Sequence, residues 1–446
     1  MEPGSQFSST MLEKQSFLIA RDLPNSCEQE SEWVYNAHLL TDLSDDKHPV
    51  EEGERNKLSG DTEGEDTEMD VDCLIPSQDQ GNDQNHAGVM VDDSTLLIHQ
   101  LGRDMSINCL VRCSRSDYGS IASLNRSFWS LIRTGELYRL RRQMGIEEHW
   151  VYFSCNIIDW EAFDPNRGRW MKFPKMNWTE CFMCSDKESL GVGTELLVFG
   201  KEILAPVIHK YSVLTNTWSR GMEMNGPRCL FGSASLGGIA IIAGGSDLRG
   251  NILSTAELYN SDTGTWETLP NMNKARKLCS GVFMDGKFYV LGGLGPGHSN
   301  HLTCAEVFDL KTRKWSEIPN MFPARNGGVG VSSTPVGAGA PPLVAVVNNV
   351  LYAADYEQQE LRRYVKHNNS WVTLGRLPDG AASLNGWGLA FRACGDRLIV
   401  IGGTGAYHGR EIEVSAWVPD EGAPQWNLLG RRYSGSFVYN CAVMGC

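Results

Sequence analysis

Apolar residues between positions 147 and 446 come in short runs separated by glycine, asparagine, aspartate and threonine. One stretch contains C-S-G-V-F-M at 279–284, F-Y-V-L at 288–291, A-E-V-F-D-L at 305–310 and K-W-S-E-I at 314–318. Short apolar runs bounded by turn-forming residues predict β-strands rather than helices. Four such runs form one unit, after which the pattern starts again.

Tryptophans mark the repetition of this unit. They follow one another at intervals of 48, 48, 49, 56 and 55 residues, at Trp170, Trp218, Trp266, Trp315, Trp371 and Trp426. Six units of four strands predict an all-β propeller with six blades.

Pairs of glycines end apolar runs in several units, at Gly244-Gly245, Gly292-Gly293 and Gly402-Gly403. A nucleotide-binding glycine loop would be followed by a helix, but the chain after Gly409 alternates like a strand and meets Pro419 and Pro424. The pairs are therefore predicted to be structural: each lets the second strand end close to the crowded centre and turn.

The glycine pair, an aromatic residue about a dozen positions on and a tryptophan opening the fourth strand resemble the Kelch repeat. The resemblance covers residues 147–446 and implies a Kelch propeller, although Gly200-Lys201 and Ala353-Ala354 replace the glycine pair in two units. The first unit lacks an innermost strand. The C-terminal segment F-V-Y-N-C-A-V-M at 437–444 is predicted to supply it, because an unclosed ring would expose two sheet edges.

Glutamates recur two residues before the aromatic, at Glu161, Glu257 and Glu306. An active site would not be copied three times, so these carboxylates are predicted to be buried hydrogen-bond partners rather than catalytic acids.

Residues 96–142 differ in kind, because their apolar positions keep helical spacing with a break at Ser116-Asp117. This segment resembles an F-box, the helical module that docks on a Skp-type adaptor, although Gly102 stands where the pattern usually has proline. The adaptor-binding residues that the resemblance implies are Leu101, Asp104, Met105, Ile107, Leu110, Leu124, Phe128, Leu131 and Ile132. The alternative is a helical hairpin that only packs on the propeller.

An F-box before a Kelch propeller resembles the plant F-box/Kelch-repeat family of substrate receptors. The resemblance implies a non-catalytic subunit of an SCF-type ubiquitin ligase, joined through the adaptor to cullin and RING subunits, whose propeller binds the protein to be ubiquitinated. A Kelch scaffold without a ligase is the first alternative. A propeller enzyme is the second, disfavoured because no Ser-His-Asp signature or converging metal ligands are apparent. No cofactor or metal is expected.

Arginines lie ten residues after three successive tryptophans, at Arg228, Arg276 and Arg325. Equal offsets predict equivalent points on one rim, where guanidiniums suit an acidic or phosphorylated protein partner. Glu180 holds the same offset in another unit, and Arg249 and His298, in loops after glycine pairs, are expected to border the same face. The alternative is that each arginine bonds backbone carbonyls of its own turn.

Charge separates the N-terminal region from the rest. Residues 41–95 hold 17 acidic and 3 basic residues, a balance of −14, which equals the net charge of the whole 446-residue chain. Residues 1–95 are therefore expected to be a mostly disordered acidic tail, and the neutral remainder gives no reason to expect nucleic-acid binding. Thirteen cysteines without a secretory signal, and no apolar run of membrane-spanning length, predict a soluble protein of the nucleus or cytoplasm.

Overall fold

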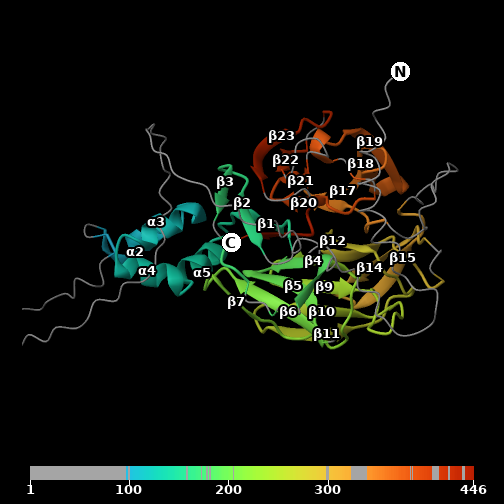
Figure 1. Ribbon diagram of the computed structural model, residues 1–446, viewed down its shortest axis with the longest axis horizontal. Helices are drawn as coiled ribbons and strands as arrows, with labels where there is room; N and C mark the ends of the chain where they lie inside the picture. Colours follow the sequence, from blue (N-terminus) through green and yellow to red (C-terminus); the bar gives the residue numbers. More distant parts are fainter. Residues whose placement is uncertain are drawn as a thin grey trace, which may run out of the picture.

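Strands and tight turns alternate from residue 149 to residue 445, and they build six four-stranded antiparallel sheets arranged as a propeller (Figure 1). The structure is a computed structural model. It describes residues 97–98, 101–156, 159–171, 173–176, 179, 182–203, 205–297, 301–322, 339–381, 383, 385–403, 411–419, 422–433 and 437–445. The predicted acidic tail, residues 1–95, lies outside these residues.

The first three blades contain twelve strands. Blade 1 has β24 Asn440–Gly445, β1 His149–Ser154, β2 Trp160–Asp164 and β3 Arg169–Met171. Blade 2 has β4 Phe182–Val192, β5 Glu195–Glu202, β6 Ala205–Ser212 and β7 Thr217–Arg220. Blade 3 has β8 Gly232–Leu236, β9 Ile239–Ala243, β10 Ala256–Asn260 and β11 Thr265–Leu269.

The remaining three blades follow the same order from the inside outward. Blade 4 has β12 Ser280–Met284, β13 Lys287–Leu291, β14 Ala305–Asp309 and β15 Lys314–Ile318. Blade 5 has β16 Val344–Val347, β17 Val350–Asp355, β18 Glu360–Val365 and β19 Ser370–Arg376. Blade 6 has β20 Ala390–Cys394, β21 Arg397–Gly403, β22 Glu411–Trp417 and β23 Asn427–Tyr433.

The ring closes through the C-terminal strand. β24 pairs antiparallel with β1 along its whole length, from Ser154 opposite Asn440 to His149 opposite Gly445. Blade 1 therefore takes its innermost strand from the far end of the chain, and neither end of the propeller sequence leaves a free sheet edge at this point.

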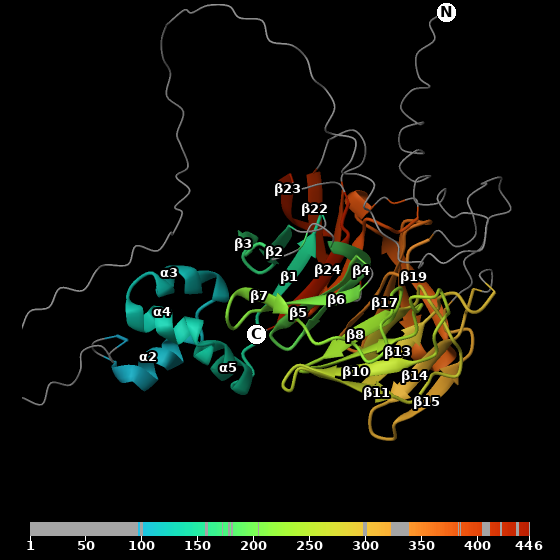
Figure 2. The ribbon, with the colours of Figure 1, turned by 60° about the horizontal axis from the view of Figure 1, so that its bottom comes forward.

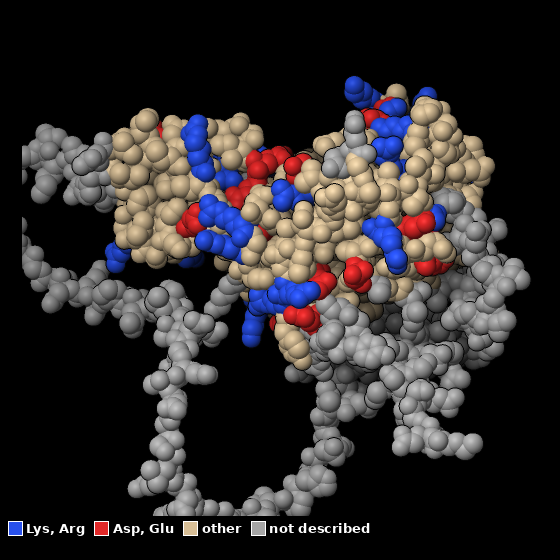
Figure 3. All heavy atoms as spheres, turned by 90° about the horizontal axis from the view of Figure 1, so that it is seen from above, with Lys and Arg blue, Asp and Glu red and all other residues tan. Residues whose placement is uncertain are grey.

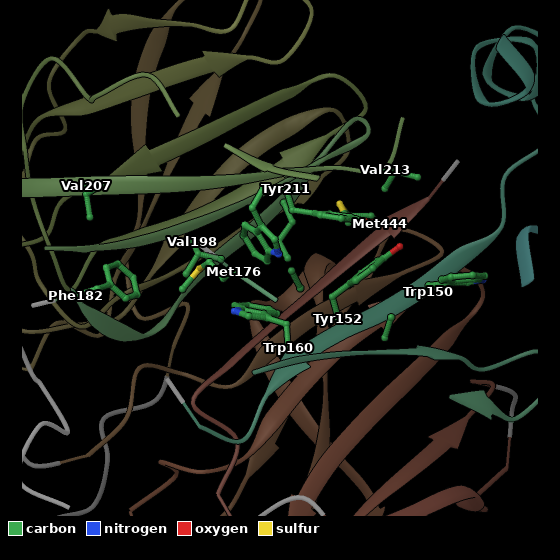
Figure 4. Packing of buried hydrophobic residues seen from close by; sticks show 14 residues of the cluster. Trp150, Tyr152, Trp160, Met176, Phe182, Val198, Val207, Tyr211, Val213 and Met444 are labelled. Carbon is green, nitrogen blue, oxygen red and sulfur yellow. The ribbon is translucent and has the colours of Figure 1, made fainter. Parts of the chain in front are cut away.

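The hydrophobic core lies between blades rather than within one of them. Each of six buried clusters combines side chains of two neighbouring blades. Between blades 1 and 2, Tyr152, Trp160, Tyr211 and Met444 point toward one another (Figure 4). A single four-stranded sheet cannot bury both its faces, so each blade is stable only beside its neighbours.

The marker tryptophans of the repeat form hydrogen bonds between neighbouring blades. The indole Nε1 of each of these tryptophans donates a hydrogen bond to a backbone carbonyl at the end of the previous blade. Trp266 donates to the Met222 carbonyl at 2.9 Å, and Trp315 donates to the Pro270 carbonyl at 2.7 Å. Trp218, Trp371 and Trp426 repeat the contact with Pro174, Met321 and Arg376. The indole ring packs beside the aromatic of the third strand, 4.9 Å from the Tyr259 centroid in blade 3.

The glycine pairs of blades 3 and 4 make the predicted turns. Gly244 and Gly245 have φ of +69° and +96°, and a Cβ on Gly244 would lie 2.3 Å from the Arg276 carbonyl oxygen. Gly292 and Gly293 repeat the left-handed conformation. In blade 6 the pair remains within β21, and Gly402 instead allows close approach, since its Cβ would lie 2.3 Å from the Gly380 carbonyl.

Before the propeller the chain forms a small helical module beside it (Figure 2). Its elements are α2 Gly102–Leu110, the 3-10 turn η3 Arg115–Asp117, α3 Tyr118–Ala122, α4 Arg126–Arg133 and α5 Glu136–Gln143. The predicted break at Ser116-Asp117 is the turn η3, which is capped by the Ser114 side chain, while Asn125 caps α4 by accepting from Phe128 N at 2.9 Å. A strong apolar face on α4 then packs this helix on the others.

Candidate adaptor and substrate surfaces

The helical module has a hydrophobic core of its own. It is made of buried side chains from every helix, namely Leu97, Leu110, Val111, Tyr118, Phe128, Leu131 and Leu137. Ile107 and Ile132 are partly buried against it. Five of the predicted adaptor-binding side chains thus pack in this core or against it, namely Ile107, Leu110, Phe128, Leu131 and Ile132. Their part in adaptor binding stays a prediction.

Other apolar side chains of the module face solvent. Leu101, Met105, Leu124 and Trp129 are 42%, 56%, 69% and 49% exposed. Leu101 and Met105 stand four residues apart at the start of α2 and so share one side of that helix. Trp129 was not singled out from the sequence. Its exposure could have been inferred from the pair Phe128-Trp129, because only one of two adjacent helical residues can face the core.

Gly102 explains why proline is absent from the start of this module. Its φ is +67°, in the left-handed region, whereas the proline ring fixes φ near −65°. A Cβ at this position would meet no atom within 4 Å. Proline could not adopt this conformation, and the side chains of Leu101, Asp104 and Met105 near it are exposed.

Glu148 joins the module to the propeller. Its carboxylate accepts hydrogen bonds from Ser114 Oγ at 2.6 Å, Arg115 N at 2.9 Å, Arg141 Nη2 at 3.0 Å and Trp150 Nε1 at 3.1 Å. Burial acts to raise the pKa of Glu148, but these hydrogen bonds and the nearby guanidinium charge outweigh it and the pKa is lowered. A single charged group thus connects the turn η3 and the helix α5 of the module to the first propeller strand, β1.

The module contacts one end of the propeller. We call turn face the end made by the turns between the first and second and between the third and fourth strands of each blade. Arg167 in the blade 1 turn pairs with Asp117 at 2.9 Å, and Asp262 in the blade 3 turn pairs with Arg142 at 3.2 Å. In antiparallel blades the remaining loops lie at the opposite end, which we call loop face, so the module leaves that face uncovered in the described residues.

The predicted rim of arginines is wrong for Arg228 and Arg276. Their exposed fractions are only 1% and 0%, because each guanidinium is enclosed by its own blade. Arg228 donates to Glu257 at 2.6 Å and to the Thr255 carbonyl at 2.8 Å. Burial lowers the pKa of Arg228, and the Glu257 charge opposes that change. Neither side chain can reach a partner.

The same network recurs one blade later. Arg276 donates to Glu306 at 2.8 Å and to the carbonyls of Gly292 and Cys304 at 3.1 Å. Glu306 also accepts from Asn273 N at 2.6 Å, as Glu257 accepts from Asn225 N at 2.8 Å. The prediction that these glutamates are buried hydrogen-bond partners is confirmed. Glu161 in blade 1 is partly buried and pairs with Arg432 of blade 6 at 3.3 Å.

Of the other predicted substrate-face residues, Arg249 is on the loop face and exposed. Asp247 shapes its loop by accepting from Arg249 N at 2.9 Å and Asn251 N at 2.8 Å. Burial acts to raise the pKa of Asp247, but these hydrogen bonds and those from the Asn251 side chain lower it. Leu248 and Arg249 therefore point outward from an ordered turn. Arg325, Glu180 and His298 lie outside the described residues.

Charged side chains on the propeller are interspersed rather than gathered by sign in the view of Figure 3. Among the described residues no group of three histidine, cysteine or acidic side chains is arranged to hold a metal ion. None of the helices in the described part of the chain is both long and apolar enough to cross a membrane.

Comparison with known proteins agrees with this architecture. The family model described as Kelch motif matches residues 227–273 and 275–322, which contain blades 3 and 4. F-box/kelch-repeat protein At1g74510 of Arabidopsis thaliana is 54% identical over 98% of this chain and 100% of its own length. F-box/kelch-repeat protein SKIP11 of the same plant is 61% identical over 87% of this chain and 84% of its own length.

Fold and repeats define a Kelch-type six-bladed propeller preceded by a helical module. A third relative, F-box/kelch-repeat protein At1g26930 of Arabidopsis thaliana, is 59% identical over 84% of this chain and 88% of its own length. At these identities and coverages the chain belongs to the F-box/kelch-repeat protein family.

Proposed function

We propose that this protein is the substrate-recognition subunit of an SCF-type ubiquitin ligase in the nucleus or cytoplasm. The helical module at 96–142 acts as the F-box and binds a Skp-type adaptor, which joins the chain to cullin and RING subunits. The propeller binds the protein to be ubiquitinated. The subunit itself is non-catalytic, and the transfer of ubiquitin takes place on other subunits.

The observation that carries this proposal is the division of apolar residues in the module. Its core is already closed by seven buried side chains, so Leu101, Met105, Leu124 and Trp129 are not needed to fold it. Exposed apolar residues of this size, gathered on one small module, are typical of a surface that another protein covers. Family membership favours a Skp-type adaptor as that protein.

Placement of the module supports the second half of the proposal. It sits on the turn face, held by Glu148 and by ion pairs such as Arg167 with Asp117. Binding residues often lie on exposed loops that a rigid scaffold holds in place. The loop face, with Leu248 and Arg249 pointing outward, is therefore the proposed substrate surface.

Co-purification of the full chain with a Skp-type adaptor tests the proposal. We expect a stoichiometric complex with the wild-type chain and at least about a tenfold loss of affinity when Leu101→Ala and Met105→Ala are combined, because exposed apolar anchors carry such interfaces. The matched control is Leu248→Ala, an apolar residue of similar exposure on the loop face, which should bind normally.

Circular dichroism and thermal unfolding should show that the double variant keeps its fold, since both side chains lie outside the core. Failure of the folded wild-type chain to bind any Skp-type adaptor would instead favour a Kelch scaffold that is not attached to a ligase.

A further inference from the structure

Two accessible thiols distinguish the helical module from the propeller. Cys109 is exposed and Cys113 is half-buried, whereas the other cysteines whose side chains the structure describes are buried, namely Cys155, Cys229, Cys279, Cys304, Cys394 and Cys441. Burial raises the pKa of the Cys394 thiol to about 12 and that of the Cys279 and Cys441 thiols to about 11. Buried thiols of this kind are poor metal ligands, because a metal binds the thiolate.

The two accessible thiols lie on neighbouring turns of one helical segment. Cys109 belongs to the last turn of α2, and the winding continues beyond it, since the N–H groups of Arg112 and Cys113 donate to the carbonyls of Cys109 and Leu110 at 3.2 Å and 3.1 Å. Side chains of a helix lean toward its N-terminus. Accordingly, Sγ of Cys113 lies over the preceding turn and donates to the carbonyl oxygen of Cys109 at 3.6 Å.

A buried arginine holds the backbone of this segment in place. Arg141 is only 2% exposed, and its Nη1 donates to the carbonyls of Val111 and Cys113 at 2.8 Å and 2.6 Å. The Cys113 side chain also packs against the core of the module. The turn that carries Cys113 is thus ordered before any ligand binds, which lowers the entropic cost of binding.

The spacing of the pair favours a bridging atom over a direct sulfur–sulfur bond. Cβ atoms four residues apart on a helix are separated by about 5–6 Å. A disulfide requires a Cβ separation of about 3.5–4.5 Å, so it would form only if the helix were distorted. Two metal–sulfur bonds of about 2.3 Å each span the larger gap. The geometry therefore suits one atom bound between the two sulfurs.

The number and type of ligands select the metal. Zinc in proteins takes four protein ligands in structural sites and three in catalytic ones, but no group of three histidine, cysteine or acidic side chains is placed to hold a metal among the residues that the structure describes. Cu(I) is a soft ion that is stable with two thiolate ligands, and thiolates favour it over harder metals. A pair of cysteines therefore matches Cu(I).

We propose that Cys109 and Cys113 form a dithiolate site for Cu(I) at the C-terminal end of α2. On binding, each thiol releases its proton to solvent and two copper–sulfur bonds form. Copper stays monovalent and no electron is transferred. The site needs no adaptor, so it is independent of the proposed ligase function.

Titration of Cu(I) into the reduced full chain without oxygen, in competition with the Cu(I) chelator bathocuproine disulfonate, tests this proposal. We expect the affinity of the site to fall at least about a hundredfold in Cys109→Ser, because the second thiolate of a pair binds at high effective concentration. The neighbouring substitution Asn108→Ser is the control and should leave the affinity unchanged.

A second variant keeps the number of thiols constant. Asn108→Cys combined with Cys109→Ser moves one thiol to a different side of the helix, so it should lose the site as Cys109→Ser does. Asn108 and Cys109 are both exposed, and thermal unfolding of the metal-free variants should therefore match that of the wild-type chain.

A trivalent arsenical tests the proximity of the two thiols. Phenylarsine oxide condenses with two nearby thiols, so that two arsenic–sulfur bonds form and the oxygen leaves as water. Trypsin cuts after Arg112, and mass spectrometry should therefore find peptides 104–112 and 113–115 of the wild-type chain joined through arsenic. The joined peptides should be absent from Cys109→Ser.

Two results would overturn the proposal. Equal Cu(I) affinity in the wild-type chain and in Asn108→Cys combined with Cys109→Ser would show that copper binds thiols elsewhere in the chain. Arsenic-joined peptides together with unchanged Cu(I) affinity in Cys109→Ser would show two close thiols that do not hold copper. Neither experiment includes an adaptor, so failure here is distinguishable from failure of the proposed ligase function.

Discussion

Blades 3 and 4 and blades 2 and 6 use charged residues in opposite ways. In blades 3 and 4, Arg228 and Arg276 are buried and paired with Glu257 and Glu306. In blades 2 and 6, Lys187 and Arg392 line the central channel and donate to backbone carbonyls. The first pair of blades is also the part that matches the Kelch motif.

This difference shows what repetition in a propeller means. A charged residue that recurs at a fixed offset satisfies a need that every regular blade has, here the polar backbone groups of the turn between strands. Lys187 and Arg392 also bond backbone carbonyls, but neither contact is repeated in blades 3 and 4.

The largest expected effect is on the buried pairs. Arg276→Met leaves Glu306 buried without its cation, and we expect the free energy of unfolding in urea to fall by about 3–5 kcal/mol. Arg313→Met, which breaks the exposed pair with Glu267, should cost less than about 1 kcal/mol. Equal losses in the two variants would mean that the buried pair is not a structural element of its blade.

A smaller effect is expected at the glycine pair. Gly244→Ala places a Cβ 2.3 Å from the Arg276 carbonyl at a φ of +69°, and we expect a loss of about 2–4 kcal/mol from strain and overpacking. Gly264→Ala is the matched control, because its φ is +68° but no atom lies within 4 Å. It should cost about 1 kcal/mol, so similar midpoints in urea would contradict close packing at Gly244.

Glu148→Gln should have the smallest effect, about 1.5 kcal/mol at neutral pH, because a charged acceptor becomes neutral. The pKa of Glu148 is lowered in the folded protein, so its contribution is present above the ordinary glutamate pKa of about 4.3 and is lost as the pH falls through the lower folded value.

Urea unfolding of the wild-type chain and Glu148→Gln over this pH range checks the assignment. The difference between them should shrink below about pH 4.3. A difference that stays constant would show that the charge of Glu148 does not hold the junction.

Much of the propeller could be predicted because its determinants are local and repeated. Each marker tryptophan bonds the carbonyl that leads away from the previous blade, and the glycines take conformations that other residues avoid, so one rule appears several times in the sequence. Antiparallel blades also need an innermost strand, which made the role of the C-terminal segment predictable.

Burial of the arginines was harder to predict, since an offset along the chain places a residue in a loop but does not say which way it points. The sequence nevertheless contained a signal for it. Arg228 and Arg276 recur together with Glu257 and Glu306, and an arginine that recurs at a fixed distance from a glutamate is expected to form an ion pair with it. Lys187 had no such signal. Its position depends on a register shift in β4 and on contacts with β20 and β24, which are more than 200 residues away.

The most direct test of the account is amide hydrogen exchange of the full chain with and without a bound Skp-type adaptor. We predict new protection in α2, around Leu124 and in α4, and unchanged exchange in the loop-face segment 244–255. Protection on the loop face, or an unprotected α2 in a stable complex, would contradict the division between an adaptor surface on the module and a free substrate surface on the propeller.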